Sequence, residues 1–347
     1  MATVWFWLVL LMIMMYVVLD GFDLGAGILH LFVARTEVER RAVMRSIGPV
    51  WDGNEVWLLA AGGTLYFAFP VLYATAFSGF YLPLMMVLWL LIGRALGIEF
   101  RHQIDSPAWQ PLWDVVFAVS SALLALFFGV AMGNVVRGVP LDASGRFFEP
   151  LWTDFSPYGA TGILDWYTIA VGLAALATLA MHGALWITLK TDEDLQARSR
   201  RTALRLWWAV LVLMALVTLA TFHVQPHVLE RLHAAPWSAV LPLLAVSALS
   251  LARWFCLKRC DALAFLASAG FLGVMLVMVA FSMFPYVLPA STDPALGLTH
   301  EHAAAEPYAL KVGLAWWIPG MVLVTAYFFF VYRQFAGKVR LDEEGHY

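Results

Sequence analysis

Residues 4–33 read VWFWLVLLMIMMYVVLDGFDLGAGILHLFV, a nearly continuous apolar stretch that contains two aspartates. About 20 apolar residues suffice for a helix to cross the hydrocarbon core of a bilayer, so this stretch is predicted to span a membrane. Asp20 and Asp23 would share one face of that helix. Ionisable side chains inside a membrane are costly and often mark proton or ion paths. The pair is therefore the first candidate functional site. The alternative is a structural role, in which the aspartates cap a neighbouring helix or pair with an arginine.

Gly21 and Gly25 lie on the same predicted helix, one turn apart. Small residues at this spacing let two transmembrane helices approach closely. We therefore expect another backbone to pack against this segment, which would surround the aspartates with protein rather than lipid.

Composition extends this prediction to the whole chain. The 347 residues are 62% hydrophobic and only 13% charged, and a soluble domain would carry about 25% charged residues. The apolar residues also form long blocks, which indicates a single all-α integral membrane domain over residues 1–347. We expect nine transmembrane helices, at about 4–33, 54–76, 77–99, 112–136, 165–189, 203–223, 237–256, 262–287 and 312–333.

The lysines and arginines predict the orientation. If the N-terminus is periplasmic, all but four of the 21 fall in inner loops or in the C-terminal tail; the outer loops hold only Arg137, Arg146, Arg231 and Lys311. Such a bias places the C-terminus in the cytoplasm. The first stretch lacks the basic segment and cleavage site of a signal peptide and is expected to remain as a helix. A net charge of −3 argues against a nucleic-acid partner.

A second acidic group opens the second predicted helix, in the sequence Trp51-Asp-Gly-Asn-Glu-Val-Trp57. Asp52 and Glu55 have the order of a capping box, with the aspartate as N-cap and the glutamate at N3. A carboxylate at the cytoplasmic mouth of a membrane helix could also collect protons. These two interpretations are compatible, and both remain open.

A third group lies at the inner end of the third predicted helix. It consists of Glu99, Arg101, His102 and Asp105, with Arg94 one to two turns earlier. Ion pairing at the membrane edge is the favoured interpretation of this group.

The histidines and cysteines predict no metal or redox centre in this chain. Only His182 and, less centrally, His30 fall within predicted helices, whereas a membrane dihaem cytochrome needs paired axial histidines on facing helices. The outer His300-Glu301-His302 tract is best explained by chance placement. Cys256 and Cys260 lack further zinc ligands nearby and are expected to be reduced thiols on the cytoplasmic side.

At these residues the chain resembles subunit II of cytochrome bd-type quinol oxidases. The first helix carries Asp-Gly-Phe-Asp-Leu-Gly, and the following loop carries Ser-Ile-Gly-Pro-Val-Trp-Asp-Gly-Asn-Glu-Val-Trp-Leu. Shorter matches follow in order along nearly the whole chain. The matching segments are residues 20–25, 39–41, 46–58, 76–81, 133–134, 138–140 and 284–289.

The resemblance implies two four-helix bundles plus one peripheral helix, in the bacterial cytoplasmic (inner) membrane. It also implies a non-haem subunit of an oxidoreductase that oxidises quinol at the outer face and reduces dioxygen to water. Two b-type haems and haem d would belong to a partner, subunit I. Protons would come from the cytoplasm, so that a gradient forms without pumping. A structural quinone and a small single-span accessory subunit are compatible with the family, although no residue here identifies a quinone pocket.

For individual residues, the resemblance implies a proton route whose cytoplasmic mouth is Asp52. Asp20, Asp23 and Glu55 would continue this route toward the haems of the partner. Trp57, on the same helix as Asp52, would line an apolar path for dioxygen.

Two other functions remain as alternatives. A secondary transporter could use intramembrane carboxylates to couple protons to a substrate, but the sequence shows no pair of unwound half-helices, and its acidic groups gather near one face. A dihaem cytochrome b would require haem to stay bound to this chain alone.

Overall fold

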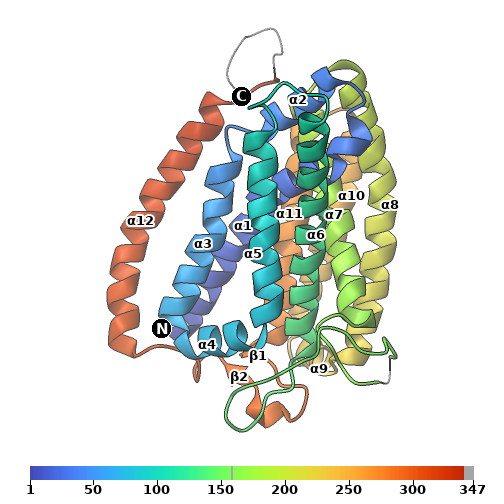
Figure 1. Ribbon diagram of the computed structural model, residues 1–347. Helices are drawn as coiled ribbons and strands as arrows, with labels where there is room; N and C mark the ends of the chain where they lie inside the picture. The colour runs from blue at the N-terminus through green and yellow to red at the C-terminus, as the bar shows by residue number, and fades with distance from the viewer. Residues whose placement is uncertain (158, 340–347) are drawn as a thin grey trace.

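Long helices run side by side along the whole molecule (Figure 1), in a computed structural model that describes residues 1–157 and 159–339. Arg340, which contributed to the charge count of the C-terminal tail, lies outside the described residues. The helices are α1 Ala2–Val33, α2 Glu37–Ile47, α3 Trp51–Ala68, α4 Pro70–Gly79, α5 Tyr81–Phe100, α6 Trp109–Arg137, α7 Trp166–Lys190, α8 Glu193–Val224, α9 His227–Ala234, α10 Val240–Leu257, α11 Asp261–Met283 and α12 Pro307–Gln334. Two short 3₁₀ helices, η1 Pro236–Ala239 and η2 Pro294–Leu296, and a two-stranded hairpin, β1 Tyr286–Leu288 with β2 Leu298–Thr299, complete the list.

The chain termini lie at opposite ends of the bundle (Figure 1). We call the end that carries α2 the inner end, and the end that carries α4 and α9 the outer end. The predicted orientation places the inner end in the cytoplasm. Within the described part of the chain, eight helices are long and apolar enough to cross a membrane.

The prediction of one continuous helix over residues 54–76 is wrong. In the structure α3 ends at Ala68, and α4 continues after a bend of 119°. Pro70 opens α4, and the preceding Phe69 has a non-helical backbone, as expected for a residue before proline. The 18 residues of α3 are about 27 Å long, close to the thickness of the hydrocarbon core. The pair is thus a candidate for a ninth crossing, and the count of nine remains a prediction.

Other parts of the chain also differ from the prediction, among them the third helix, which begins at Tyr81 rather than at residue 77. The loop after α1 contains α2, which starts with a capping box between Thr36 and Glu39. Helix α8 begins at Glu193, well before the apolar stretch, because its first turns form an inner-end extension whose arginines find acidic partners. Helix α11 ends at Met283, since the chain then turns through Pro285 into β1.

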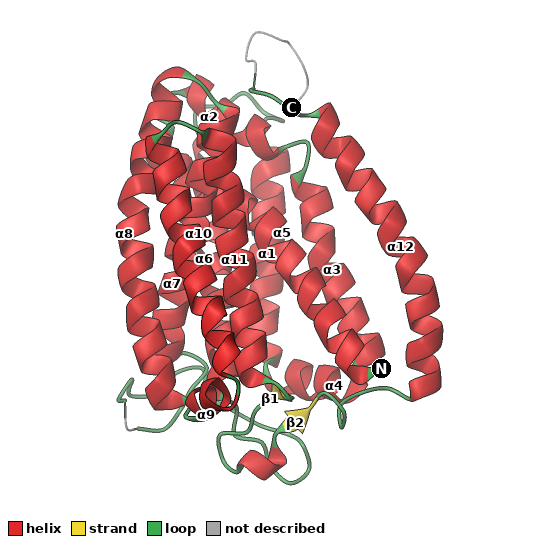
Figure 2. Cartoon of the chain, turned by 180° about the vertical axis from the view of Figure 1, so that it is seen from behind, coloured by secondary structure: helices red, strands yellow, loops and turns green. Residues whose placement is uncertain are grey.

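The glycine seam in α1 is confirmed. A Cβ atom on Gly25 would lie 2.1 Å from the carbonyl oxygen of Leu179 and 2.7 Å from the Cα atom of Gly183, so α1 and α7 touch through their backbones. Helix α1 also packs against α3 and α6. In contrast, α12 stands at the edge of the bundle in both views (Figures 1 and 2), and Trp316 on it is 77% exposed.

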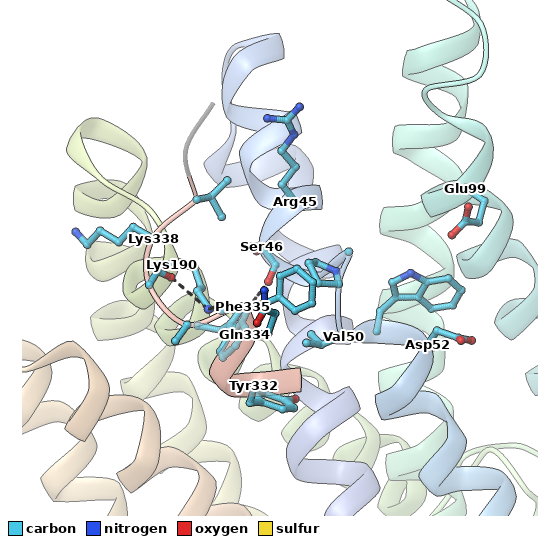
Figure 3. A pocket seen from close by; sticks show the side chains of 17 residues that line it. Arg45, Ser46, Val50, Asp52, Glu99, Lys190, Tyr332, Gln334, Phe335 and Lys338 are labelled. Atoms are coloured by element: carbon cyan, nitrogen blue, oxygen red, sulfur yellow. Dashed lines mark hydrogen bonds between the residues drawn. The ribbon is translucent and has the colours of Figure 1, made fainter. Parts of the chain in front are cut away.

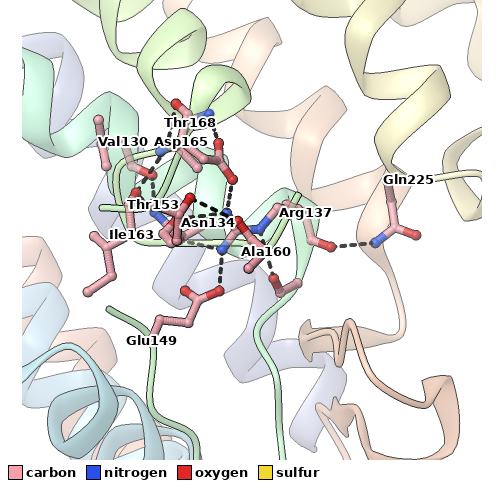
Figure 4. Close-up of polar contacts among 12 residues, drawn as sticks. Val130, Asn134, Arg137, Glu149, Thr153, Ala160, Ile163, Asp165, Thr168 and Gln225 are labelled. Carbon is pink, nitrogen blue, oxygen red and sulfur yellow. Dashed lines mark hydrogen bonds and ion pairs between the residues drawn. The ribbon is translucent and has the colours of Figure 1, made fainter. Parts of the chain in front are cut away.

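The long outer loop after α6 is fixed by one buried arginine (Figure 4). Arg137 donates to Asn134 at 2.8 Å, to the carbonyl oxygen of Gly162 at 2.9 Å and to Glu149 at 2.7 Å, and it also pairs with Asp165. Burial raises the pKa of Glu149, against the opposing effect of Arg137. This arrangement anchors the loop to the ends of α6 and α7.

Candidate functional site

Buried ionisable side chains gather between α1, α3 and α5. We call this set the acidic cluster; its members are Asp20, Asp23, Glu55 and Arg94. Three carboxyl groups therefore face one guanidinium group. The sequence placed Glu55 in a second group with Asp52 and placed Arg94 in a third group, and only the resemblance joined Asp20, Asp23 and Glu55 in one route.

Asp20 and Arg94 form a two-pronged ion pair. Arg94 Nη1 donates to Asp20 Oδ2 at 2.6 Å, and Nη2 donates to Oδ1 at 2.5 Å. Both side chains are fully buried. Glu55 lies 3.4 Å from the same guanidinium and is 22% exposed. The structural alternative, in which an aspartate pairs with an arginine, is confirmed for Asp20. The prediction that Arg94 belongs to a group at the membrane edge is wrong, because its guanidinium points into the bundle.

Asp23 has a different environment from Asp20. Its Oδ2 atom accepts a hydrogen bond from Asn54 Nδ2 at 2.8 Å, and Asn54 Oδ1 accepts one from the Tyr332 hydroxyl at 2.9 Å. Among the described residues no cation pairs with Asp23, and its Oδ1 atom is buried without a hydrogen-bond partner. Asp23 is thus a buried acid held by neutral groups only.

A cleft of about 850 Å³ opens at the inner end, beside this cluster (Figure 3). Asp52 is an exposed member of its wall, and Glu99 lies on the neighbouring helix. Figure 3 shows Tyr332 beyond Gln334 and Phe335, on the side of the cleft that faces the bundle. Tyr332 therefore both lines the cleft and reaches the acidic cluster through Asn54.

The predicted capping box of Asp52 and Glu55 is wrong. Helix α3 begins at Trp51, its N-cap residue is Val50, and no side chain caps it. Asp52 consequently lies in the first turn, where a negative charge is favoured by the helix dipole. Its carboxyl group remains available at the rim of the cleft.

A second set of charged side chains, centred on the buried Asp114, joins the inner ends of α1, α2, α5 and α6. We call it the basic cluster; its members are His30, Glu37, Arg40, Arg101 and Asp114. Asp114 accepts from His30 Nε2 at 2.5 Å, from Arg101 Nε at 2.5 Å and from Arg40 Nη1 at 3.1 Å. Arg101 also donates to Glu37 at 2.8 Å.

The sequence predicted ion pairing for Arg101, and this is confirmed, but its partners are Glu37 and Asp114 rather than the neighbouring Glu99 and Asp105. Asp114 was missed. Asp114 is the only carboxylate within the apolar stretch 112–136. A carboxylate in an apolar stretch is also the signal that identified Asp20, so the sequence could have indicated Asp114 in the same way.

The other candidate residues are also buried. Trp57 is 4% exposed and packs against Phe328 of α12, with 5.5 Å between ring centroids. His182 uses both ring nitrogens in hydrogen bonds, to Ser268 at 2.7 Å and to the carbonyl oxygen of Val18 at 3.0 Å. Across residues 1–157 and 159–339, no three histidine, cysteine or acidic side chains are grouped so that they could hold a metal ion.

The chain is similar to a set of known membrane proteins. A family model described as cytochrome bd terminal oxidase subunit II matches residues 1–335. The cytochrome bd ubiquinol oxidase subunit 2 of Bacillus subtilis is 34% identical, over 89% of this chain and 88% of that protein. The probable cytochrome oxidase subunit 2 of Haemophilus influenzae is 31% identical, over 97% of this chain and 94% of its own length.

A solved structure supports the fold. The bd oxidase of Geobacillus thermodenitrificans contains a chain that matches with a TM-score of 0.76 and 18% sequence identity. The match covers 96% of this chain and 98% of that chain. The helical arrangement described above is therefore shared with a chain of a bd oxidase.

Proposed function

The chain belongs to the cytochrome bd terminal oxidase subunit II family, and from that premise we propose that it brings cytoplasmic protons toward the oxygen-reducing centre of its partner subunit. It is subunit II of a cytochrome bd-type oxidase, a multi-pass protein of the bacterial inner membrane and part of a respiratory oxidoreductase complex. This assignment replaces the transporter and dihaem cytochrome alternatives.

The excess of buried carboxyl groups is the observation that carries the proposal. Asp20 and Glu55 contact the guanidinium of Arg94, and Asp23 is buried in the same cluster with Asn54 as its hydrogen-bond partner. Burying an unpaired carboxylate costs several kcal/mol. Protons are the simplest counter-charge for the two carboxyl groups that remain. A site that must bind protons to stay neutral can also take up and release them.

The geometry supports a direction for this transfer. Asp52 stands at the rim of the cleft, where it can exchange protons with the cytoplasm. Glu55 lies one turn further along the same helix face and contacts Arg94. Asp20 and Asp23 follow on α1, and both are fully buried. The chain would thus offer acids of stepwise increasing burial.

The partner is proposed to do the redox chemistry. Subunit I would bind the two b-type haems and haem d, which supply the site of dioxygen reduction, and would oxidise quinol. Relatives in Bacillus subtilis and Escherichia coli are named ubiquinol oxidase subunits. If each electron that reaches oxygen consumes one cytoplasmic proton while quinol releases its protons outside, a gradient forms without pumping.

Dioxygen access is a second proposed role. Trp57 lies in an apolar cluster with Ala61 of the same helix and Met12 of α1, next to Phe328 of α12. Because dioxygen is apolar, such a lining favours it over water. Glu55 and Trp57 are two residues apart on α3, so their side chains leave the helix on different faces, and protons and dioxygen are proposed to use different faces of this helix.

Replacement of Asp52 tests the proton route. In the assembled complex Asp52→Asn is expected to reduce oxygen-reduction turnover about tenfold, equivalent to roughly 1.4 kcal/mol of barrier, with unchanged haem content. Glu99→Gln is the matched control, because Glu99 lines the same cleft but contacts no member of the acidic cluster among the described residues. Wild-type turnover in a fully assembled Asp52→Asn complex would contradict the inlet role.

A further inference from the structure

We propose that Tyr332 of α12 is a positioning residue for Asp23: through Asn54 it fixes which oxygen of the Asp23 carboxyl group carries an exchangeable proton. The inference rests on the proposed proton route. It adds a residue from the outermost helix, which the route as derived above does not include.

The side-chain amide of Asn54 has an acceptor end, which contacts Tyr332, and a donor end, which contacts Asp23. An asparagine side chain accepts hydrogen bonds at its oxygen and donates them only at its nitrogen. The Tyr332 hydroxyl donates to Asn54 Oδ1 at 2.9 Å, and this leaves Nδ2 facing Asp23 Oδ2 at 2.8 Å and the carbonyl oxygen of Leu19 at 3.3 Å. The Leu19 carbonyl can only accept, so it keeps Nδ2 on this side, and the Tyr332 hydroxyl holds the amide at its oxygen end. If the hydroxyl is removed, Oδ1 loses this partner and the amide is held less firmly against Asp23.

The two oxygens of Asp23 are thereby made unequal. Oδ2 accepts a hydrogen bond, while Oδ1 is buried with no partner in the described part of the chain. The charged groups nearby are Asp20, Glu55 and Arg94, and the guanidinium is already bound by Asp20. A neutral Asp23 with its proton on Oδ1 satisfies both the charge count and the Asn54 contact.

Tyr332 connects α12, the helix at the edge of the bundle, to Asp23. Helix α12 is otherwise held mainly by apolar contacts such as Phe328 against Trp57. Just beyond Tyr332, Lys190 Nζ donates to the carbonyl oxygens of Phe335 at 2.7 Å and Gly337 at 3.2 Å, which fixes the end of α12 to α7. The position of α12 is therefore transmitted to Asp23 through one hydroxyl group and one amide.

Infrared difference spectroscopy on the assembled complex tests the proposal. The carbonyl stretch of protonated Asp23 is identified as the band that Asp23→Asn removes. Tyr332→Phe is expected to shift that band. Tyr327→Phe, which removes an exposed hydroxyl from the same helix, is expected to leave it in place. Asn54→Leu, which removes the bridge but keeps Tyr332, is expected to shift the band as well and serves if Tyr332→Phe does not assemble.

The pH profile of turnover gives a second readout. An Asn54 amide that is held less firmly donates a weaker hydrogen bond to the Asp23 carboxylate, so the acid holds its proton more tightly. The profile of Tyr332→Phe is therefore expected to move to higher pH, and that of Tyr327→Phe is not.

Two results would overturn the inference: a band that Tyr332→Phe and Asn54→Leu leave unmoved, or the absence of any band lost in Asp23→Asn. Neither result depends on whether Asp52→Asn slows turnover. Failure of the inference and failure of the proposed function can therefore be told apart.

Discussion

The acidic cluster and the basic cluster both link α1 to α5 or its inner end, and they differ in how their charges balance. In the acidic cluster, carboxyl groups outnumber the one guanidinium, and no cation in the described part of the chain pairs with Asp23. In the basic cluster, the buried carboxylate of Asp114 is surrounded by two arginines and a histidine. Both lie among long apolar helices, so the surrounding fold alone does not determine their chemistry.

The difference explains why only one cluster suits proton transfer. A group can exchange protons only if both of its charge states are tolerated. Asp23 meets this condition because its hydrogen-bond partners are neutral. Asp114 does not, since a proton on it would neutralise the carboxylate that Arg40 and Arg101 share and leave Glu37 to balance the two arginines. We infer that the basic cluster fixes the inner ends of four helices, and that the acidic cluster carries protons.

The largest effect is expected from breaking the basic cluster. Asp114→Asn leaves two arginines that cannot lose their protons next to an uncharged side chain. Removing one partner of a buried ion pair typically costs about 3–5 kcal/mol. The expected result is a sharp fall in the yield of haem-containing complex and in its thermal stability.

Asp105→Asn is the control for that variant, because Asp105 is exposed at the same end of the molecule. If Asp114→Asn assembled and melted like Asp105→Asn, the basic cluster would not stabilise the protein, and the contrast between the two clusters would be lost.

A smaller effect is expected from a partly exposed ion pair beside the basic cluster. Glu39 accepts from the backbone of Arg35 and pairs with Arg198, which joins α2 to α8. Burial opposes ionisation, but these contacts outweigh it and lower the pKa of Glu39 below 4.5. Because the folded pKa is the lower one, the pair stabilises the protein above pH 4.5 and loses this effect as the pH falls through the folded pKa.

Glu39→Gln should therefore reduce stability by about 1 kcal/mol or less at neutral pH, with the difference from wild type vanishing in acid. Thermal melts of the complex at neutral and acidic pH provide the measurement. A deficit that persisted unchanged in acid would argue against the ion pair as its source.

The sequence allowed most of the fold to be predicted, because length and apolarity determine which segments can cross a bilayer. The bend at Pro70 was missed, since the hydropathy of residues 54–76 continues across it. A proline and the residue before it often mark such a bend, but the prediction gave more weight to the length of the apolar stretch. Helix α2 was missed for the opposite reason, because its short, polar sequence carries no membrane signal.

For the site, the sequence identified the acids but not their partners. Asp20 and Asp23 were found because a carboxylate in an apolar stretch is rare. Their distinct environments depend on Arg94 and Tyr332, which come from distant parts of the chain. Spacing along one helix cannot show which residue of another helix arrives beside it, so only the folded structure separates the paired aspartate from the unpaired one.

Proton uptake during oxygen reduction is the most direct test of the central claim that the acidic cluster supplies protons. A pH-sensitive dye can follow uptake when the fully reduced, assembled complex is mixed with oxygen. With Asp23→Asn, which preserves the shape of the side chain, the account predicts markedly slower uptake at unchanged haem content. Uptake as fast as in the wild-type complex would contradict it.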